Sequence, residues 1–238
     1  RPILALLAGT AFLLGASGLH GLLLPLRGQA EGFSTGALGL LGTACAGGFI
    51  AGCYIVPRLV RNVGHIRTFA TCAATGAIVA LLTGIWIDAY VWILLRAFTG
   101  FAMAGAFMVI ESWLNERATN ENRGTVFGLY MMVTYASIMA GQMLVAFGDV
   151  TAAALFMVAG IFFCASLIPT SISTAASPAP LADVRLDLKG LYANSPVAAV
   201  GCLLIGVANG AWGTLGAVYG ARAGISTAEI ALMMSLVV

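Results

Sequence analysis

Two stretches of the sequence share one pattern, and their spacing decides the fold. The first reads SGLHGLLLPLRGQAEGFST over 17–35, and the second reads NGAWGTLGAVYGARAGIST over 209–227. A shift of 192 positions carries Ser17 onto Asn209 and aligns the two without gaps. Between residues 15–35 and 207–227, eight of 21 positions are identical, including four glycine pairs. We interpret the pattern as an internal duplication.

The composition predicts a protein that crosses a membrane several times. Hydrophobic residues make up 61 % of the chain, charged residues only 8 %, and the mean hydropathy is +1.00. A water-soluble domain carries roughly 25 % charged residues, so this chain has too few to cover a surface exposed to water. Its 30 glycines fit the same interpretation, because membrane helices pack through small residues.

The apolar runs predict an all-α fold. A membrane-spanning helix needs about 20 apolar residues. On that basis we expect helices over 3–26, 34–56, 67–87, 91–114, 124–147, 152–169 and 197–219, and an eighth from Thr227 that runs to Val238. The long polar stretch 171–196 is predicted to be a linker with a short surface helix over 182–192. The predicted units are a six-helix bundle (1–170), the linker (171–196) and the start of a second bundle (197–238).

Positive charge predicts the orientation of the helices. Loops on the cytoplasmic side of a membrane are enriched in Lys and Arg. One set of predicted loops holds eight cations and the other holds only Arg27 and Arg222; the eight are Arg1, Arg58, Arg61, Arg67, Arg117, Arg123, Arg185 and Lys189. We therefore expect a multi-pass protein of the cell inner membrane whose amino terminus and linker are cytoplasmic.

The duplication suggests a function for the predicted fold. Both copies cover the outer half of a helix, the loop after it and the start of the next helix. The repeat is therefore parallel, and its period contains six helices and the linker. Two six-helix halves joined in this way are typical of secondary transporters, whose binding site lies between the halves.

Several motifs resemble the major facilitator superfamily. PRLVRNVGHIR (57–67) is similar to the family's Gly-x-Leu-x-Asp-Arg-x-Gly-Arg-Arg loop, except that Arg61 stands where the family has Asp. RAFTG (96–100) resembles the Arg-x-x-x-Gly signature of helix 4, and ESWLNERATNENRG (111–124) the segment between helices 4 and 5. VIES, NRG, YMMVTY and GQ are similar to the YcaD-type branch. The resemblance implies about twelve helices, so we expect 1–238 to hold one half and the first one or two helices of the other. By itself this part is expected not to transport.

His20 and Arg96 are ionisable residues at membrane depth, where such groups are costly and often functional. His20 either donates a hydrogen bond across a helix contact or forms part of a cavity or outer gate and accepts a proton. Its partner in the repeat is Trp212. Arg96 either reaches outward to lipid headgroups or binds an anionic solute in a cavity.

Polar residues in three other places complete the candidate set. Tyr135 and Gln142 on the fifth helix and Asn209 on the seventh need partners at membrane depth, so we expect them to line the cavity. The predicted solute route is thus His20, Arg96, Tyr135, Gln142, Asn209 and Trp212. The charges Arg58, Arg61, Glu111 and Arg123 are expected at a cytoplasmic gate.

The function expected from these features is secondary transport of a small, anionic solute by alternating access, with a proton as the candidate coupling ion. The alternative is a non-transporting accessory or assembly subunit that keeps the fold for helix contacts. The sequence holds no phosphate loop, nucleophile elbow or zinc motif, and its five cysteines lack metal-type spacing. We therefore expect no enzyme, no cofactor, no metal and no nucleic acid. The expected partners are the solute, the bilayer and the remaining helices of the second half.

Overall fold

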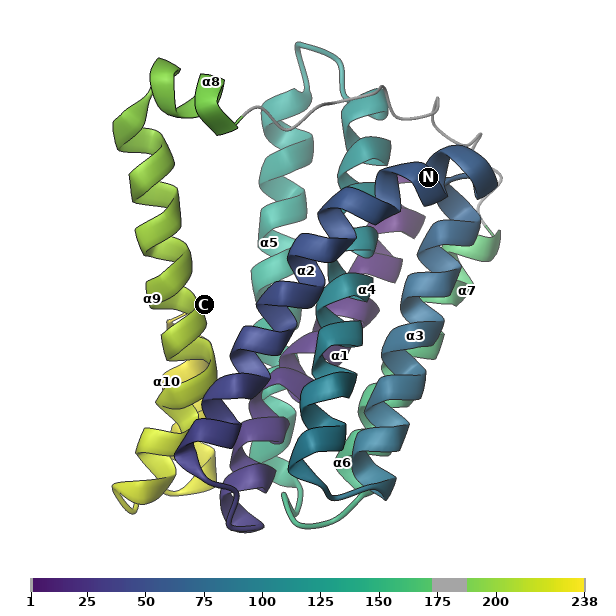
Figure 1. Cartoon of the computed structure of the whole chain (residues 1–238). Coiled ribbons are helices and arrows are strands. Elements are labelled where there is room, and N and C mark those ends of the chain that lie inside the picture. The colour runs from purple at the N-terminus through teal and green to yellow at the C-terminus, as the bar shows by residue number, and fades with distance from the viewer. Residues whose placement is uncertain (1, 173–187, 238) are drawn as a thin grey trace.

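The structure, a computed structural model, describes residues 2–172 and 188–237 and contains helices without any strand in those ranges. The helices are α1 (Pro2–Ala30), α2 (Thr35–Val63), α3 (His65–Ile85), α4 (Ala89–Arg117), α5 (Arg123–Leu144), the 3₁₀ turn η1 (Val145–Phe147), α6 (Ala154–Ala165), α7 (Leu167–Ile172), α8 (Leu188–Asn194), α9 (Pro196–Arg222) and α10 (Thr227–Leu236) (Figure 1). Seven of the helical segments are long and apolar enough to cross a membrane. The prediction of an all-α membrane fold is confirmed.

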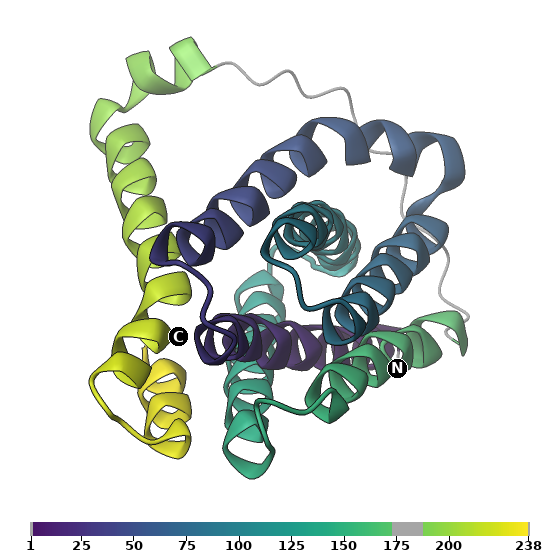
Figure 2. The same ribbon diagram turned by 60° about the horizontal axis from the view of Figure 1, so that its bottom comes forward.

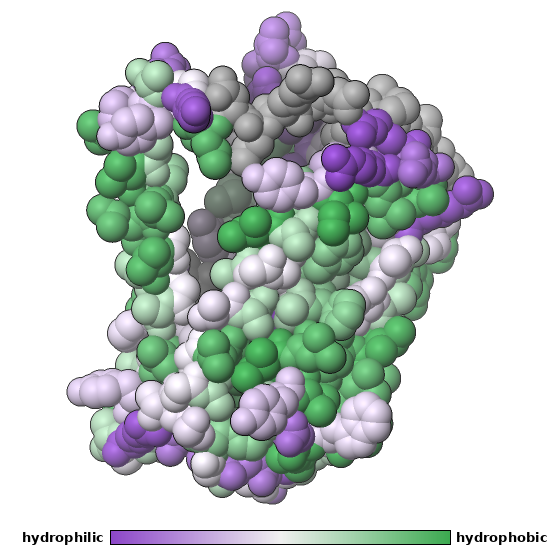
Figure 3. Space-filling model, viewed as in Figure 1, coloured by the Kyte–Doolittle hydropathy of each residue, from purple (hydrophilic) through white to green (hydrophobic). Residues whose placement is uncertain are grey.

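The helices form a bundle and an adjoining pair. α1 to α7 pack together, while α9 and α10 lie beside them and contact α1, α2 and α5 (Figures 1 and 2). A broad belt of hydrophobic residues lies between polar ends, as expected for a molecule surrounded by lipid (Figure 3). We call one end of the bundle the α8 end and the opposite end, where α9 joins α10, the Arg222 end.

Glycines allow two pairs of helices to cross at very short range. A Cβ atom at Gly18 of α1 would overlap the carbonyl of Ile138 on α5, and one at Gly141 would overlap Gly15. α2 and α4 cross in the same way, since a Cβ at Gly48 would overlap the carbonyl of Ala97. Close approach of small residues is the usual means of helix packing in lipid. These contacts fix the walls on which the candidate site is built.

The local structure repeats along with the sequence. Gly32 and Gly224 end α1 and α9 with φ angles of 76° and 79°, which glycine adopts without strain. The amide of residue 33 donates to the carbonyl of Gly28 at 2.9 Å, and that of residue 225 to Gly220 at 3.0 Å. Ser34 and Ser226 then cap α2 and α10 with nearly equal backbone angles. The two turns are thus the same structure 192 residues apart, which agrees with the duplication.

Two segment ends differ from the prediction. α2 does not stop at residue 56 but continues through Pro57 to Val63, so only Gly64, with a φ of 85°, separates it from α3. The predicted loop 57–67 is therefore mostly helical, because a single glycine suffices for the reversal. The sixth span is broken at Ser166 into α6 and α7. Pro169 lacks the N–H that would bond to Ala165, which weakens the helix there.

The predicted clustering of positive charge has a structural counterpart. Because successive spans alternate in direction, the α8 end holds Arg58, Arg61, Arg67, Arg117, Arg123 and Lys189, while Arg27 and Arg222 lie at the other end (Figure 1). Of the surface helix expected over 182–192, the described part begins at Leu188 as α8; positions 173–187 of the linker lie outside the described residues.

Candidate functional site

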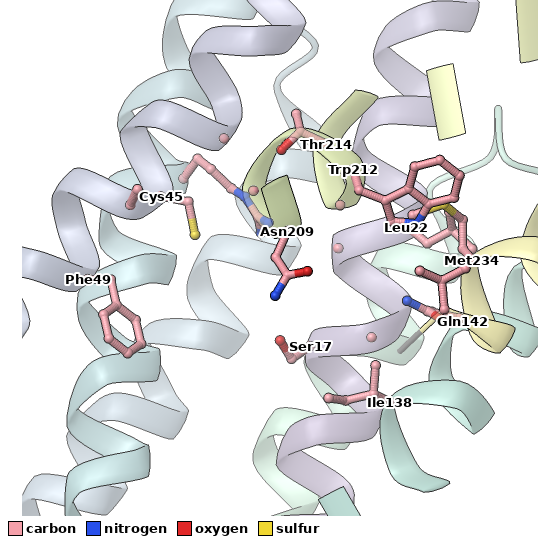
Figure 4. A pocket seen from close by; sticks show the side chains of 18 of the residues that line it. Ser17, Leu22, Cys45, Phe49, Ile138, Gln142, Asn209, Trp212, Thr214 and Met234 are labelled. Carbon is pink, nitrogen blue, oxygen red and sulfur yellow. The ribbon is translucent and has the colours of Figure 1, made fainter. Parts of the chain in front are cut away.

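A cavity of about 720 Å³ lies between the bundle and the pair α9–α10 (Figures 3 and 4). That volume is in the range of small-molecule sites, which measure roughly 300–1,000 Å³. α1, α2, α4 and α5 supply one side, and α9 and α10 supply the other. Its polar and aromatic lining residues are Ser17, Cys45, Phe49, Arg96, Tyr135, Gln142, Asn209, Trp212 and Thr214.

Arg96 is the charged residue of this lining, which contains no acidic side chain. It is half-buried on α4, and it forms no ion pair or hydrogen bond with any residue in 2–172 or 188–237. Asp88, the nearest carboxylate before it in the chain, caps α4 by accepting from the amides of Tyr90 and Val91, both at 2.9 Å. An arginine stays protonated at any physiological pH, so the cavity carries an uncompensated positive charge.

Gln142 brings a carboxamide to the same cavity from α5. Its side chain is only 9 % exposed, and its Oε1 atom is buried with no hydrogen-bond partner in the structure. Figure 4 shows Gln142 and Asn209 extending into the cavity from opposite sides, from α5 and α9 respectively. A buried polar group without a partner is costly, which makes such a group a candidate for binding a ligand.

Of the six residues expected on the solute route, the structure brings five together. Arg96, Tyr135, Gln142, Asn209 and Trp212 all line the cavity. Trp212 is 40 % exposed, so a large part of its indole is open for contact. These placements concern geometry; the roles of the five residues in transport stay predictions.

His20 does not line this cavity, contrary to the expectation. It is 1 % exposed, and its ring packs edge-on against Phe156 of α6 with centroids 6.0 Å apart. Neither ring nitrogen has a hydrogen-bond partner in the structure, so the hydrogen bond across a helix contact is also not seen. The difference arises from rotation about α1. Ser17, Gly18, Gly21 and Leu22 face the cavity, and His20 points from the same helix toward α6.

The sequence reasoning missed several lining residues. Ser17 of α1, Cys45 and Phe49 of α2, and Thr214 of α9 all contribute to the cavity wall. Small hydroxyl, thiol and aromatic side chains occur throughout membrane helices, so their type alone gives no signal. The repeat offered one hint, since Ser17 and Asn209 are equivalent positions and both are polar.

The cavity is closed at the Arg222 end by contacts of α9. The Nε atom of Arg222 donates to Oε1 of Gln29 at 3.1 Å. Nearby, Gly42 of α2 approaches Thr214 so closely that a Cβ on the glycine would overlap the hydroxyl. Toward the α8 end the side chains of α9 are exposed, among them Val197, Leu203, Leu204 and Val207. The contacts of α9 with the bundle thus lie near the Arg222 end, while toward the α8 end a gap separates α9 from the bundle (Figure 3).

The four residues expected at a cytoplasmic gate lie at the α8 end and are exposed. Glu111 accepts a hydrogen bond from the Tyr130 hydroxyl at 3.4 Å, and Arg123 donates to the Asn115 side chain. No ion pair joins Glu111 to a basic residue in the part of the chain that the structure describes. Over the same residues, no group of three or more His, Cys, Asp or Glu side chains is placed to hold a metal ion.

Comparison with known proteins gives one family. The family model of the Major Facilitator Superfamily matches residues 6–238. The chain is 29 % identical over 145 residues to the "Uncharacterized MFS-type transporter YcaD" of Escherichia fergusonii, and 30 % identical over 153 residues to that of Escherichia coli O45:K1. Each match covers 61 % of this chain and 38 % of the relative.

A solved structure shares the fold. The crystal structure of the nucleoside transporter NupG is similar with a TM-score of 0.61 at 17 % sequence identity. The similarity covers 83 % of this chain and 50 % of that one. The chain therefore spans half or less of the length of the proteins it matches.

Proposed function

This chain belongs to the Major Facilitator Superfamily, and on that premise we propose that it forms part of a secondary transporter for a small anionic solute. The solute binds in the cavity between the bundle and the α9–α10 pair, and alternating access exposes that cavity to one side of the membrane at a time. The protein works in the cell inner membrane with its amino terminus in the cytoplasm, in accord with the positive charge at the α8 end.

One observation carries the choice of an anion. Arg96 lines the cavity without an acidic neighbour in the lining and without a hydrogen-bond or ion-pair partner elsewhere in the described chain. A guanidinium in a low-dielectric surrounding attracts an anion strongly and can bind a carboxylate or phosphate with two parallel hydrogen bonds. Lipid headgroups, the other expected target of Arg96, do not explain a place in the cavity lining.

The alternative, an accessory subunit that does not transport, predicts helices packed against each other without a polar interior. The cavity supports transport instead, because six of its side chains carry polar groups that bond to no other described residue; they are Ser17, Arg96, Tyr135, Gln142, Asn209 and Thr214. Polar groups left free in a membrane protein are costly unless water or a solute satisfies them.

The test is uptake by full-length protein reconstituted in proteoliposomes, over a panel of anionic, neutral and cationic solutes. We expect uptake of an anionic solute, and Arg96→Ala is expected to abolish it without changing folding. Arg96→Lys should retain part of the rate, because a point charge replaces the two-pronged guanidinium. Lys189→Ala, which removes an exposed cation of α8 outside the cavity lining, is the control.

Two outcomes would contradict the proposal. One is normal anion uptake by Arg96→Ala, and the other is uptake of neutral or cationic solutes alone. An imposed pH gradient tests the proton as the coupling ion in the same vesicles: uptake that is driven by the gradient and abolished by a protonophore supports it.

A further inference from the structure

The hydroxyl groups of the cavity differ from those of several threonines elsewhere in the membrane helices. Thr10, Thr83 and Thr99 each donate to the backbone carbonyl four residues earlier, at 2.9, 2.7 and 3.3 Å. This is the usual way for a helix in lipid to satisfy a hydroxyl. Ser17 and Thr214, which line the cavity, make no such bond to any described residue. Their hydroxyls are available to an occupant of the cavity.

The two carboxamides are available in the same way. Asn209 bonds to no described residue, and the buried Oε1 of Gln142 lacks a partner. A carboxamide offers a donor and an acceptor side by side, and a half-turn about its last torsion exchanges them. An occupant that satisfies such a group must itself both donate and accept. A hydroxyl group does so, whereas a carboxylate only accepts.

The positive charge of the cavity disfavours an ammonium group as the hydrogen-bond donor of the solute. An ammonium group donates three hydrogen bonds, but it is positively charged and would share the cavity with Arg96. With no acidic side chain in the lining, nothing offsets the repulsion between the two cations. The amine of an α-amino acid is therefore unsuited to this site, and a neutral hydroxyl is suited to it.

The walls are apolar and aromatic beside these polar groups. Trp212 and Phe49 are 40 % and 38 % exposed, and both line the cavity. Such rings are well matched to a carbon skeleton and poorly matched to the hydration shell of an inorganic ion. They favour an organic anion over sulfate or phosphate alone.

We propose that the solute is a hydroxylated organic anion without an ammonium group. Its anionic group binds Arg96, and its hydroxyl groups bond to the carboxamides of Gln142 and Asn209. This inference rests on the proposed function, since it extends the same site. It assigns Gln142 and Asn209 the part of distinguishing solutes, while Arg96 supplies the attraction common to all anions.

The experiment compares matched solutes on full-length protein. Malate, lactate and gluconate are each paired with the analogue that lacks the hydroxyls, namely succinate, propanoate and hexanoate. Aspartate and alanine replace the hydroxyl of malate and lactate by an ammonium group. Binding is measured by calorimetric titration, and uptake by competition in vesicles. We expect at least one hydroxylated member to bind about tenfold or more tightly than both analogues, the size of one net hydrogen bond.

Variants then locate the discrimination. Gln142→Leu and Asn209→Leu should reduce the preference for the hydroxylated member to less than about threefold, while the affinity for its deoxy analogue stays within about twofold. Retained binding of the analogue shows that each variant folds. Gln142→Met, which keeps the length of the side chain, should behave as Gln142→Leu does. Asn62→Leu, at an exposed carboxamide outside the cavity, should leave the preference unchanged.

The outcomes separate this inference from the proposed function. Loss of all anion binding in Arg96→Ala, with no preference for a hydroxyl in any pair, would refute the inference and leave the proposed function standing. A preference that survives both leucine variants would refute the role of the carboxamides. Anion binding that is unchanged in Arg96→Ala would overturn the proposed function itself.

Discussion

α1 and α9 contain two copies of one sequence, yet they lie in opposite surroundings. In the most apolar window of α1, 72 % of the residues are buried within the protein, while in that of α9 none are. α1 is enclosed by α5, α6 and α9, whereas α9 contacts the bundle only along the part near Arg222. The turns that follow the two helices are nevertheless the same. The copied sequence therefore determines the local fold, and the neighbours determine the packing.

Equivalent positions of α1 and α9 have different neighbours. Gly18 of α1 lies against the backbone of Ile138, while its equivalent Gly210 has nothing within 4 Å of the place its Cβ would occupy. His20 is buried against Phe156, while its equivalent Trp212 lines the cavity. Within residues 2–172 and 188–237, Gly18 and His20 thus lie in helix contacts, while their equivalents Gly210 and Trp212 line the cavity.

The largest expected effect separates the two glycines. Gly18→Val should destabilise the protein by about 3 kcal/mol, because the added atoms overlap a backbone carbonyl that cannot move away. Gly210→Val in the same 238 residues should change the free energy of unfolding by less than about 0.5 kcal/mol, since the site is open. Thermal unfolding in detergent measures both. Equal losses would contradict the different environments of α1 and α9.

The same two glycine variants can also be compared in full-length protein. If the repeat extends beyond α10, a helix equivalent to α5 packs on Gly210 in full-length protein, as α5 packs on Gly18. Gly210→Val should then cost as much as Gly18→Val. A full-length protein that tolerates Gly210→Val would show that the packing of the two halves differs at this contact.

The second prediction concerns His20 and Trp212. His20→Leu should stabilise the protein by about 1 kcal/mol, because it removes two buried nitrogen atoms that lack hydrogen bonds and keeps an apolar side chain against Phe156. Trp212→Leu should leave stability nearly unchanged and weaken solute binding. Melting temperature and titration calorimetry distinguish the two. A clear loss of stability in His20→Leu would mean that the imidazole has a partner in the membrane.

Much of this arrangement was predictable from the sequence, for a definite reason. Polar residues are rare in helices that are surrounded by lipid. Arg96, Gln142 and Asn209 were therefore conspicuous at membrane depth and were expected to line a cavity. Apolar runs of spanning length located the helices. The 192-residue offset predicted the turns at Gly32 and Gly224 as one motif.

Which side of α1 faces the cavity could not be predicted from the sequence in the same way. α1 is apolar on all sides, so hydropathy does not distinguish the side toward the cavity from the side toward α6. His20 and Ser17 lie three residues apart, and at about 100° per residue their directions differ by only about 60°. Ser17 therefore lies at the edge of the side that faces the cavity, and His20 lies just beyond that edge. The bond between Gln29 and Arg222 joins residues 193 positions apart, and no local pattern marks it.

The third prediction tests that bond as the closure of the Arg222 end. Gln29→Ala removes the acceptor for Arg222. It should destabilise the closed arrangement relative to an open one by about 1 kcal/mol. Cys45, which lines the cavity, serves as a reporter once the other four cysteines are replaced. A membrane-impermeant maleimide added from the Arg222 side should label Cys45 about fivefold faster in Gln29→Ala than in the parent.

Glu31→Gln is the control for this experiment, because Glu31, in the turn after α1, pairs with Arg27 of α1 at 2.7 Å and does not connect α1 to α9. Its labelling rate should stay near that of the parent. No change of the labelling rate in Gln29→Ala would assign closure to the packing of Gly42 against Thr214 instead. Faster labelling in the control alone would assign it to the Arg27–Glu31 pair.

The smallest effect compares the two copied turns directly. Ser34 accepts from the amide of Ala37 at 3.2 Å and Ser226 from that of Glu229 at 3.4 Å, each as the N-cap of the helix that follows. Ser34→Ala and Ser226→Ala should each cost about 0.5–1 kcal/mol, the usual value of such a cap. The second loss should exceed the first by a few tenths of a kcal/mol, because Ser226→Ala also removes the bond that the Ser226 hydroxyl donates to the Glu229 carboxylate at 2.7 Å. Hydrogen exchange at the first turns of α2 and α10 measures each helix separately. A larger loss at α2 would mean that the surrounding bundle, rather than the copied turn, sets the strength of the cap.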